Sequence, residues 1–485
     1  MTVSHTYKIL VLILISVCIQ SCNLFSEKPS QDVFFGGEIV NALDPKIIIF
    51  YQSNPIDTIK LDRDNRFFSY IRNVKPGLYS FKNGAESQNM FLEPGDSTVI
   101  YLNAKKFDET LNFSGIGSEK NNFLIENYLL NEKNNAFVLS NADKEPKAFE
   151  KLSDSIRKKR QNKLRSLKEK YDFSDKFMDL AEKSIDFEYY DMKERYTYLV
   201  TKYQKEYISK IPADFYDYRE NIEFNDPSLH SFYGYLKLVD NFLTNKVIED
   251  CYRSKLSNCD ETNNYQNIRR KLVLIDSLAH DEQLKNTYFS RLGAQAIFST
   301  TTMGQLDSIL ALLKQENLPE KKFRNLQIFA AIQNVYMPGK NLPGVDLVNF
   351  KKERIKMTEI VKRPTVFYNW SIHDSQHYME TLGIINTLRE KYPQIDFIGL
   401  NIDSEEVSPW LETMKSNGFI PSKEYQLTAI PIDKNFLKYF LNKLLFVDST
   451  GKVIMGDVQL TTPQIEARIE KFLNPEKKDF VSLKG

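Results

Sequence analysis

The segment from Pro364 to Leu382 reads P-T-V-F-Y-N-W-S-I-H-D-S-Q-H-Y-M-E-T-L and predicts a strand, a tight turn and a helix. Residues 365–368 are β-branched or aromatic, which is typical of a buried strand. Apolar residues then recur at helical spacing from Met379 to Leu388, so we expect a helix that begins near Asp374. A strand that turns into a helix N-terminus gathers free backbone N–H groups and the positive end of a helix dipole at one place.

The chain around this segment alternates strands and helices. We expect a hairpin at 345–348 and 355–357, a strand at 395–402, a helix at 407–418, a hairpin over 444–454 and a last helix at 465–472. These elements lie on both sides of the strand and helix of 364–382 in the same part of the chain.

The segment Y-N-W-S-I-H-D-S-Q-H-Y-M-E resembles the active-site strand and helix of the thioredoxin-like, TlpA-type disulfide reductases, which carry F-W-A-x-W-C-x-x-C-x-x-E. Trp370 matches the family's tryptophan. Asp374 stands at the position of the attacking cysteine, and His377 stands at that of the resolving cysteine. The 444–454 hairpin resembles the family's F-L-I-D-x-x-G-K-I, but Asn442 occupies the position of the family's cis-proline. The resemblance covers about 340–475, is supported by the order of the elements, and implies an α/β thioredoxin-like domain there without the thiol chemistry.

Several functions are open for the altered site. Disulfide exchange needs a thiolate nucleophile and a second thiol, and Asp374 and His377 supply neither. A carboxylate and an imidazole one turn apart could serve acid–base chemistry, or pair with each other when His377 is protonated. His373 and His377 share a helical face and are weak candidate metal ligands, which would need a further ligand from elsewhere. We favour a site without catalysis, metal or cofactor, in which Asp374 caps the helix.

The N-terminus has the pattern of an export signal. Lys8 precedes about nine mostly apolar residues, a run too short to span a bilayer. The run ends in Ile19-Gln-Ser-Cys22, which resembles the lipobox of bacterial lipoproteins and implies removal of residues 1–21 and lipidation of Cys22. An ordinary secretory signal is the alternative. We expect a lipid-anchored protein of the cell envelope that faces the periplasm, at the outer rather than the inner membrane, with a tether over 22–32.

Cys251 and Cys259 are the cysteines that remain after the signal and the lipidation site. In an oxidising compartment we expect them to pair as a short structural disulfide loop between two helices. A redox pair displaced from the thioredoxin-like site is the alternative.

The rest of the chain predicts two further domains and a tail. Residues 33–115 read as short strands separated by turn pairs, which predicts an all-β small sandwich or barrel. Its aromatic residues Tyr51, Phe67, Phe68 and Tyr79 either form a binding face or pack in the core, and we favour packing. Residues 116–335 carry apolar stripes at helical spacing and predict an all-α domain, and 476–485 form a C-terminal tail. This layout resembles Bacteroidetes envelope proteins that carry a TlpA-type module.

Chain length and net charge limit the number of domains and the kinds of partner that we expect. A chain of 485 residues favours about three domains, and a net charge of +1 gives no case for nucleic-acid binding. We expect a redox-inactive, membrane-anchored thioredoxin-like lipoprotein that binds extended peptides or envelope proteins. The alternative is a thiol–disulfide oxidoreductase of the TlpA type, so the sequence leaves open whether the protein is an enzyme.

Overall fold

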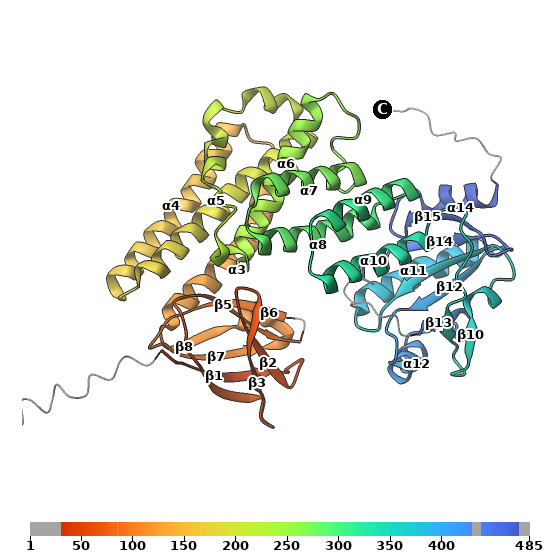
Figure 1. Ribbon diagram of the computed structural model, residues 1–485, viewed down its shortest axis with the longest axis horizontal. Helices are drawn as coiled ribbons and strands as arrows, with labels where there is room; N and C mark the ends of the chain where they lie inside the picture. Colours follow the sequence, from red (N-terminus) through yellow and green to blue (C-terminus); the bar gives the residue numbers. More distant parts are fainter. Residues whose placement is uncertain (1–30, 85, 429–437, 475–485) are drawn as a thin grey trace, which may run out of the picture. The chain divides into compact units, whose positions relative to one another are not determined.

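The computed structural model describes residues 31–84, 86–428 and 438–474 (Figure 1). The expected signal over 1–21, the expected lipidation site Cys22, most of the expected tether and the expected tail over 476–485 lie outside these residues. Within the described part, we find no helix that is both long and apolar enough to cross a bilayer. The chain forms two compact units, Met1–Lys246 and Val247–Gly485.

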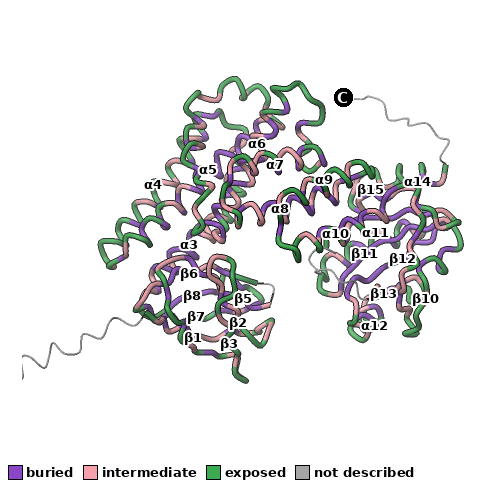
Figure 2. Tube along the Cα trace, in the orientation of Figure 1, coloured by how far each residue is buried: buried purple, intermediate pink, exposed green. Residues whose placement is uncertain are grey.

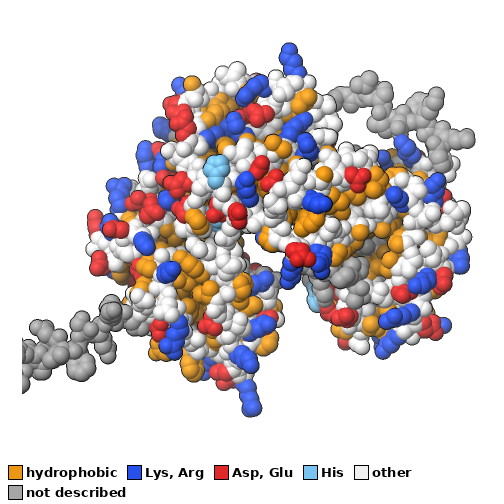
Figure 3. Space-filling view, viewed as in Figure 1, with side chains coloured by type: hydrophobic (Ala, Val, Ile, Leu, Met, Phe, Trp, Pro, Cys, Tyr) orange, Lys and Arg blue, Asp and Glu red, His pale blue; other side chains and the backbone are white. Residues whose placement is uncertain are grey.

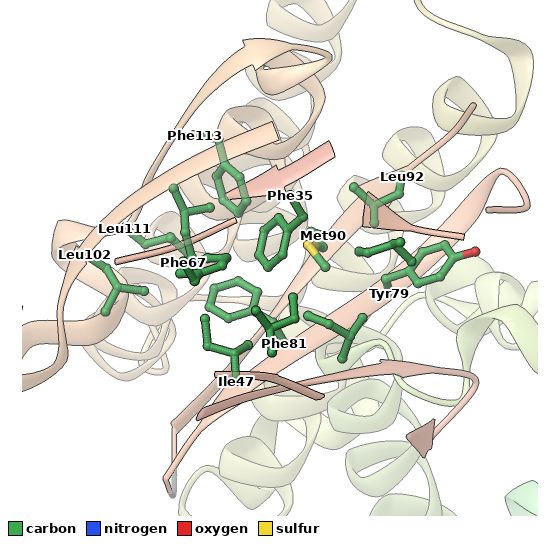
Figure 4. Close-up of a cluster of buried hydrophobic side chains, with 14 of the residues drawn as sticks. Phe35, Ile47, Phe67, Tyr79, Phe81, Met90, Leu92, Leu102, Leu111 and Phe113 are labelled. Atoms are coloured by element: carbon green, nitrogen blue, oxygen red, sulfur yellow. The ribbon is translucent and has the colours of Figure 1, made fainter. Parts of the chain in front are cut away.

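The first unit contains a β-sandwich of two four-stranded sheets, with strand orders β4-β1-β7-β8 and β3-β2-β5-β6. The strands are β1 (Val33–Val40), β2 (Lys46–Tyr51), β3 (Asn54–Lys60), β4 (Arg66–Ile71), β5 (Gly77–Asn83), β6 (Glu86–Leu92), β7 (Ser97–Asn103) and β8 (Asn112–Ile116). Aromatic and aliphatic side chains from both sheets fill the space between them, as Figure 4 shows for Phe35, Phe67 and Phe81. The predicted all-β domain is confirmed, and of the two forms expected, sandwich or barrel, the structure shows the sandwich.

Side chains alternate between the core and the solvent along these strands. In β4, Phe67 is 4% exposed and its neighbour Phe68 is 80% exposed. Tyr79 is buried, and Tyr51 packs against it with the ring centroids 4.7 Å apart. The four aromatic residues therefore do not share one face: Phe67 and Tyr79 pack inside, and Phe68 lies on the surface.

Helices complete the first unit. They are α2 (Phe107–Thr110), α3 (Ser118–Ser140), α4 (Pro146–Lys170), α5 (Asp175–Tyr203) and α6 (Tyr233–Arg253), with 3-10 turns at Ala104–Lys106, Lys205–Lys210, Ala213–Asn221 and Pro227–Leu229. Helix α5 buries the carboxylates of Glu188, Asp191 and Glu194, and these are paired with cations. The pairing offsets the large cost of removing the charges from water.

The second unit begins within α6 and joins four helices to an α/β module. The helices are α7 (Tyr265–Leu278), α8 (Glu282–Phe298), α9 (Met303–Gln315) and α10 (Glu320–Val335). Tyr336, just after α10, stacks on Phe440 of the module with the ring centroids 5.1 Å apart. The helices of 116–335 are thus divided between the two units, although the sequence suggests a single helical domain. The domain limits drawn from the sequence stay a prediction.

The module is built on a seven-stranded sheet of order β10-β9-β13-β12-β11-β14-β15. Its strands are β9 (Asp346–Val348), β10 (Arg354–Lys356), β11 (Thr365–Trp370), β12 (Asp396–Asn401), β13 (Glu424–Leu427), β14 (Lys443–Val447) and β15 (Val453–Gln459). Its helices are α11 (Ser375–Lys391), α12 (Val407–Ser416) and α14 (Ile465–Leu473), with 3-10 turns at Met357–Glu359, Pro421–Lys423 and Lys438–Phe440. Figure 2 shows β11 and β12 in the buried colour.

The strand directions make this module thioredoxin-like. β11 is parallel to β12, with α11 between them in the chain, and antiparallel to β14, which forms a hairpin with β15 before α14. The predicted α/β thioredoxin-like fold is confirmed, together with its opening hairpin, second strand and last helix. β11 runs to Trp370, two residues beyond the predicted strand, because its pairing with β12 continues to Asn401.

Candidate functional site

Asp374 is the N-cap of α11. Its Oδ1 accepts a hydrogen bond from the backbone N–H of His377 at 3.1 Å. This satisfies one of the backbone donors that a helix start leaves without an intrahelical partner. At the position of the family's attacking thiolate, this chain therefore places a capping carboxylate.

The turn before α11 is held by a buried carboxylate that lies two residues past the end of β12. Asp403, 3% exposed, accepts hydrogen bonds from Ser371 Oγ at 2.9 Å and from the Ile372 backbone N–H at 2.7 Å. Asn401 donates to the same carboxylate at 3.0 Å, and Gln426 donates to Asn401 at 3.0 Å. Sequence analysis missed this group, although its members lie at or just past the carboxyl ends of parallel strands, where sites of open α/β sheets gather.

The two histidines of the site have different partners. His377 Nε2 lies 3.1 Å from Asn442 Oδ1, so the position of the resolving cysteine faces that of the family's cis-proline. His373 Nε2 lies 3.0 Å from Glu406, just before α12. The side-chain pair that we considered between Asp374 and His377 is not formed in the structure. The Asp374 carboxylate accepts a hydrogen bond from the backbone N–H of His377. The His377 imidazole points to Asn442 instead.

These positions bear on the metal hypothesis. His373 and His377 contact separate residues rather than a shared point. Within 31–84, 86–428 and 438–474, no group of three or more His, Cys, Asp and Glu side chains is placed as metal ligands would be.

Trp370, which matches the family motif, is fixed by a buried acid. Its Nε1 donates to Glu424 Oε2 at 3.0 Å, and the Tyr368 hydroxyl donates to Oε1 of the same carboxyl group. Arg389 lies 3.5 Å from Oε1. Burial raises the pKa of Glu424 to about 7. No sequence pattern pointed to Glu424, which lies 54 residues from Trp370 in the chain.

Lys443, next to Asn442, is a buried cation at the start of β14. It is 3% exposed, and its Nζ donates to the Phe298 carbonyl at 3.1 Å and to Gln333 Oε1 at 2.9 Å. The Nζ also lies 4.1 Å from the centre of the Phe298 ring. Burial lowers the pKa of this lysine to about 7. A lysine directly before the apolar run from Leu444 to Val447 was the signal that could have drawn attention to it.

Lys443 lines a cavity of about 860 Å³ within the second unit. Carboxamides make up much of its polar lining: Asn258, Asn263, Asn264, Gln266, Gln295, Gln305 and Gln459. The lining also contains the aromatic residues Tyr265, Phe298 and Tyr439. The cavity therefore offers many paired donors and acceptors beside apolar surface.

Cys251 and Cys259 form a disulfide in the structure, with the sulfurs 2.04 Å apart. Both residues are almost completely buried. Leu256, Ser257 and Asn258, inside the loop that the disulfide closes, line the same cavity as Lys443. The disulfide thus limits the movement of one wall of that cavity.

Comparison with known proteins finds no matching family model and no matching curated protein. Among solved structures, the chain is similar to a thioredoxin domain of a thiol-disulfide oxidoreductase from Bacteroides vulgatus, with 17% identity, 28% of this chain and 98% of that chain covered, and a TM-score of 0.21. A thiol:disulfide interchange protein from Bacteroides sp. gives 17% identity, coverage of 29% and 93%, and a TM-score of 0.22. A SCO1/SenC family lipoprotein from Bacillus anthracis gives 11% identity, coverage of 28% and 94%, and a TM-score of 0.23.

Proposed function

We propose that this chain is a lipid-anchored protein of the cell envelope whose thioredoxin-like module binds peptides or partner proteins without exchanging disulfides. One observation carries the proposal: the Asp374 carboxylate caps α11 at the position where a reductase of this fold needs a thiolate. The cysteines of the described part, Cys251 and Cys259, are joined to each other and buried.

The chemistry of the helix N-terminus supports the loss of exchange. In a reductase, the helix dipole and free N–H groups lower the pKa of the attacking thiol. Here the same groups stabilise a carboxylate, which does not displace sulfur from a disulfide. His377 brings no second thiol to resolve a mixed disulfide, and its imidazole is engaged with Asn442.

The cavity beside Lys443 supports a binding role. Each carboxamide of its lining has both a donor and an acceptor, as does each peptide group of an extended chain. Tyr439 and Phe298 provide apolar surface for alternate side chains of such a peptide. Acidic and basic side chains are interspersed on the face that Figure 3 shows, and a surface of this kind does not select for a polyanion.

Selection from a random peptide library tests binding. The bait is the chain from Asn23 to Gly485, and we expect enriched peptides whose affinity falls about tenfold when Gln295 and Gln459 are both changed to Ala. The control is Gln376→Ala, since Gln376 is exposed on α11 and bonds to Glu380. Failure to enrich any sequence over bait-free beads would contradict the proposal.

The rival function is a thiol–disulfide oxidoreductase. It predicts that the chain accelerates reduction of insulin by dithiothreitol, whereas we expect the uncatalysed rate. Activity that survives replacement of Cys251 and Cys259 by Ala in the same Asn23–Gly485 chain would overturn our proposal. That chain has no cysteine, so the activity could not be assigned to the Cys251–Cys259 pair.

A further inference from the structure

The outer face of the sheet β4-β1-β7-β8 carries exposed apolar side chains. Phe68 is 80% exposed, Ile116 68%, Tyr70 59% and Tyr101 53%. Val99 is 36% exposed, and Phe34 is half-buried. We call these six residues the aromatic face. Monomeric soluble proteins seldom expose a contiguous group of this kind unless it contacts a partner or a membrane.

Strand register makes the aromatic face contiguous. Phe34 of β1 lies opposite Tyr70 of β4, and the two rings meet edge to face with the centroids 5.6 Å apart. One step along the sheet, Gly36 separates Phe68 from Val99, and it has no side chain to interrupt the surface. Ile116 belongs to the row of Phe34, because Ser97 pairs with both residues.

Ion pairs border the aromatic face along the strands in both directions. Beyond the row of Phe34, Tyr70 and Ile116, where β1 begins, Arg72 and Asp32 form an ion pair at 3.3 Å. In the other direction, Arg66 and Glu38 form an ion pair at 3.2 Å, and Tyr101 pairs with Glu38 in the register. The exposed apolar side chains therefore occupy the middle of the sheet face, and their first row lies next to the start of β1 at Val33.

The chain enters the sheet beside the first row of the aromatic face. Val33 follows the expected lipidation site, Cys22, by about ten intervening residues, which reach at most about 40 Å when fully extended. An anchor at Cys22 therefore keeps Val33, and with it the first row of the face, within about 40 Å of the bilayer.

We propose that the aromatic face docks on the lipid surface to which the chain is anchored. Phenylalanine and tyrosine side chains favour the boundary between headgroups and acyl chains, where a ring can be buried and a hydroxyl stay hydrated. The proposal rests on the membrane anchoring of the proposed function, and it adds a second attachment that does not involve the acyl chains.

A tryptophan reporter tests the docking. The native tryptophans, Trp370 and Trp410, are fully buried. The indole of Phe68→Trp is therefore the exposed one that a quencher in the acyl chains can reach when the face is docked. The chain from Asn23, with an N-terminal histidine tag, is held on phosphatidylcholine–phosphatidylglycerol vesicles that contain a nickel-chelating lipid. This tether holds the N-terminus at the vesicle surface, as an anchor at Cys22 would, and does not depend on lipidation. The control is Leu139→Trp, which places an indole at a 66% exposed site on α3, far from the sheet.

We expect brominated acyl chains to quench Phe68→Trp at least about twofold more than Leu139→Trp. Changing Tyr70 and Tyr101 to Ser in the Phe68→Trp chain should remove most of that difference. Ile116→Trp provides a second reporter if the first variant fails to fold by circular dichroism. Equal quenching of the sheet and helix reporters would overturn the proposal.

Other occupants of the face give distinct results. Concentration-dependent self-association that shields Phe68→Trp from iodide without vesicles would show a second copy on the face and would overturn membrane docking. Lipidation itself is read separately, from the mass of the N-terminal peptide of the native protein. An unmodified Cys22 would refute the anchor while leaving the nickel-tethered result on the face intact.

Discussion

Gly399 and Glu424 are register partners on the neighbouring parallel strands β12 and β13, and the glycine leaves the space that the buried carboxyl group occupies. A Cβ at Gly399 would lie 1.8 Å from Glu424 Oε2 and 2.8 Å from the Tyr368 ring. Neither neighbour is free to move, because Glu424 is bonded to both Tyr368 and Trp370.

Gly399→Ala should therefore destabilise the second unit by about 2–3 kcal/mol, through forced displacement of a packed polar group. Urea unfolding followed by tryptophan fluorescence measures it, since Trp370 and Trp410 both belong to that unit. Gly383→Ala is the matched control. It lies in α11 with no atom within 4 Å of the added Cβ, so the change should be neutral or stabilise by about 0.5–1 kcal/mol. Equal effects of the two variants would contradict the steric account.

The cap at Asp374 makes a second prediction. Asp374→Ala should lower the free energy of unfolding by about 1 kcal/mol, because the His377 backbone N–H loses its acceptor. Asp374→Asn keeps a side-chain acceptor and should retain most of the stability. Melting temperatures of the three proteins measure the difference. If Asp374→Asn were as destabilised as Asp374→Ala, the role of the carboxylate would not be that of a cap.

A third prediction restores thiols to the site. Asp374→Cys with His377→Cys should give at most weak insulin reduction with dithiothreitol, because Asn442 replaces the proline that shapes the substrate-facing loop in the family. Removing His377 also frees the Asn442 side chain, which lies 3.1 Å from it. The single Asp374→Cys chain is the control, since it lacks a resolving thiol. Activity at the level of a native reductase would show that Asn442 is no obstacle.

Local patterns were sufficient to predict the architecture but only part of the site. The spacing of apolar residues from Met379 to Leu388 predicted α11, and the composition of 365–368 predicted β11, because both signals lie within one element. Phe67 and Phe68 are neighbours in the chain, and their side chains point to opposite faces of β4. Only the register of that strand decides which ring lies in the core and which lies on the surface.

The missing parts of the site depend on contacts between distant segments. Asp403 holds the turn at Ser371, and Glu424 fixes Trp370, across separations of 32 and 54 residues. No spacing rule connects such pairs, because they meet only when parallel strands are set side by side. Lys443 could be seen as a charge directly before an apolar run, but its partners Phe298 and Gln333 come from helices far earlier in the chain.

Glu424 gives the second unit a pH-dependent stability. Its pKa in the folded chain is raised to about 7 from 4.5, so the folded state favours the protonated acid. Between these values the folded chain binds more protons than the unfolded chain, and the free energy of unfolding falls as the pH rises. Arg389, Tyr368 and Trp370 face the same carboxyl group. Glu424→Gln should flatten the decline, which we expect to be about 2–3 kcal/mol from pH 4.5 to 7.5. Urea titrations at these two pH values measure it, and an unchanged slope would contradict the assignment.

Lys443 should produce the opposite slope at higher pH. Its pKa in the folded chain is lowered to about 7 from 10.5, so the folded state favours the neutral amine. Between pH 7 and 10.5 the unfolded chain binds more protons, and the free energy of unfolding rises with pH. Asp457 is the charged neighbour that opposes this shift, and Gln333 and Phe298 contribute only neutral acceptors.

Together with Glu424, this predicts a minimum of stability near pH 7 for the second unit. Lys443→Met should remove the rise above pH 7 and leave the fall below it, whereas Glu424→Gln should do the reverse. Tryptophan-monitored urea unfolding from pH 5 to 9.5 separates the two limbs. Lys452→Met, a surface change in the turn before β15, is the matched control and should keep the full profile. A rise above pH 7 that persists in Lys443→Met would assign the upper limb to another group and refute the role given to this buried amine.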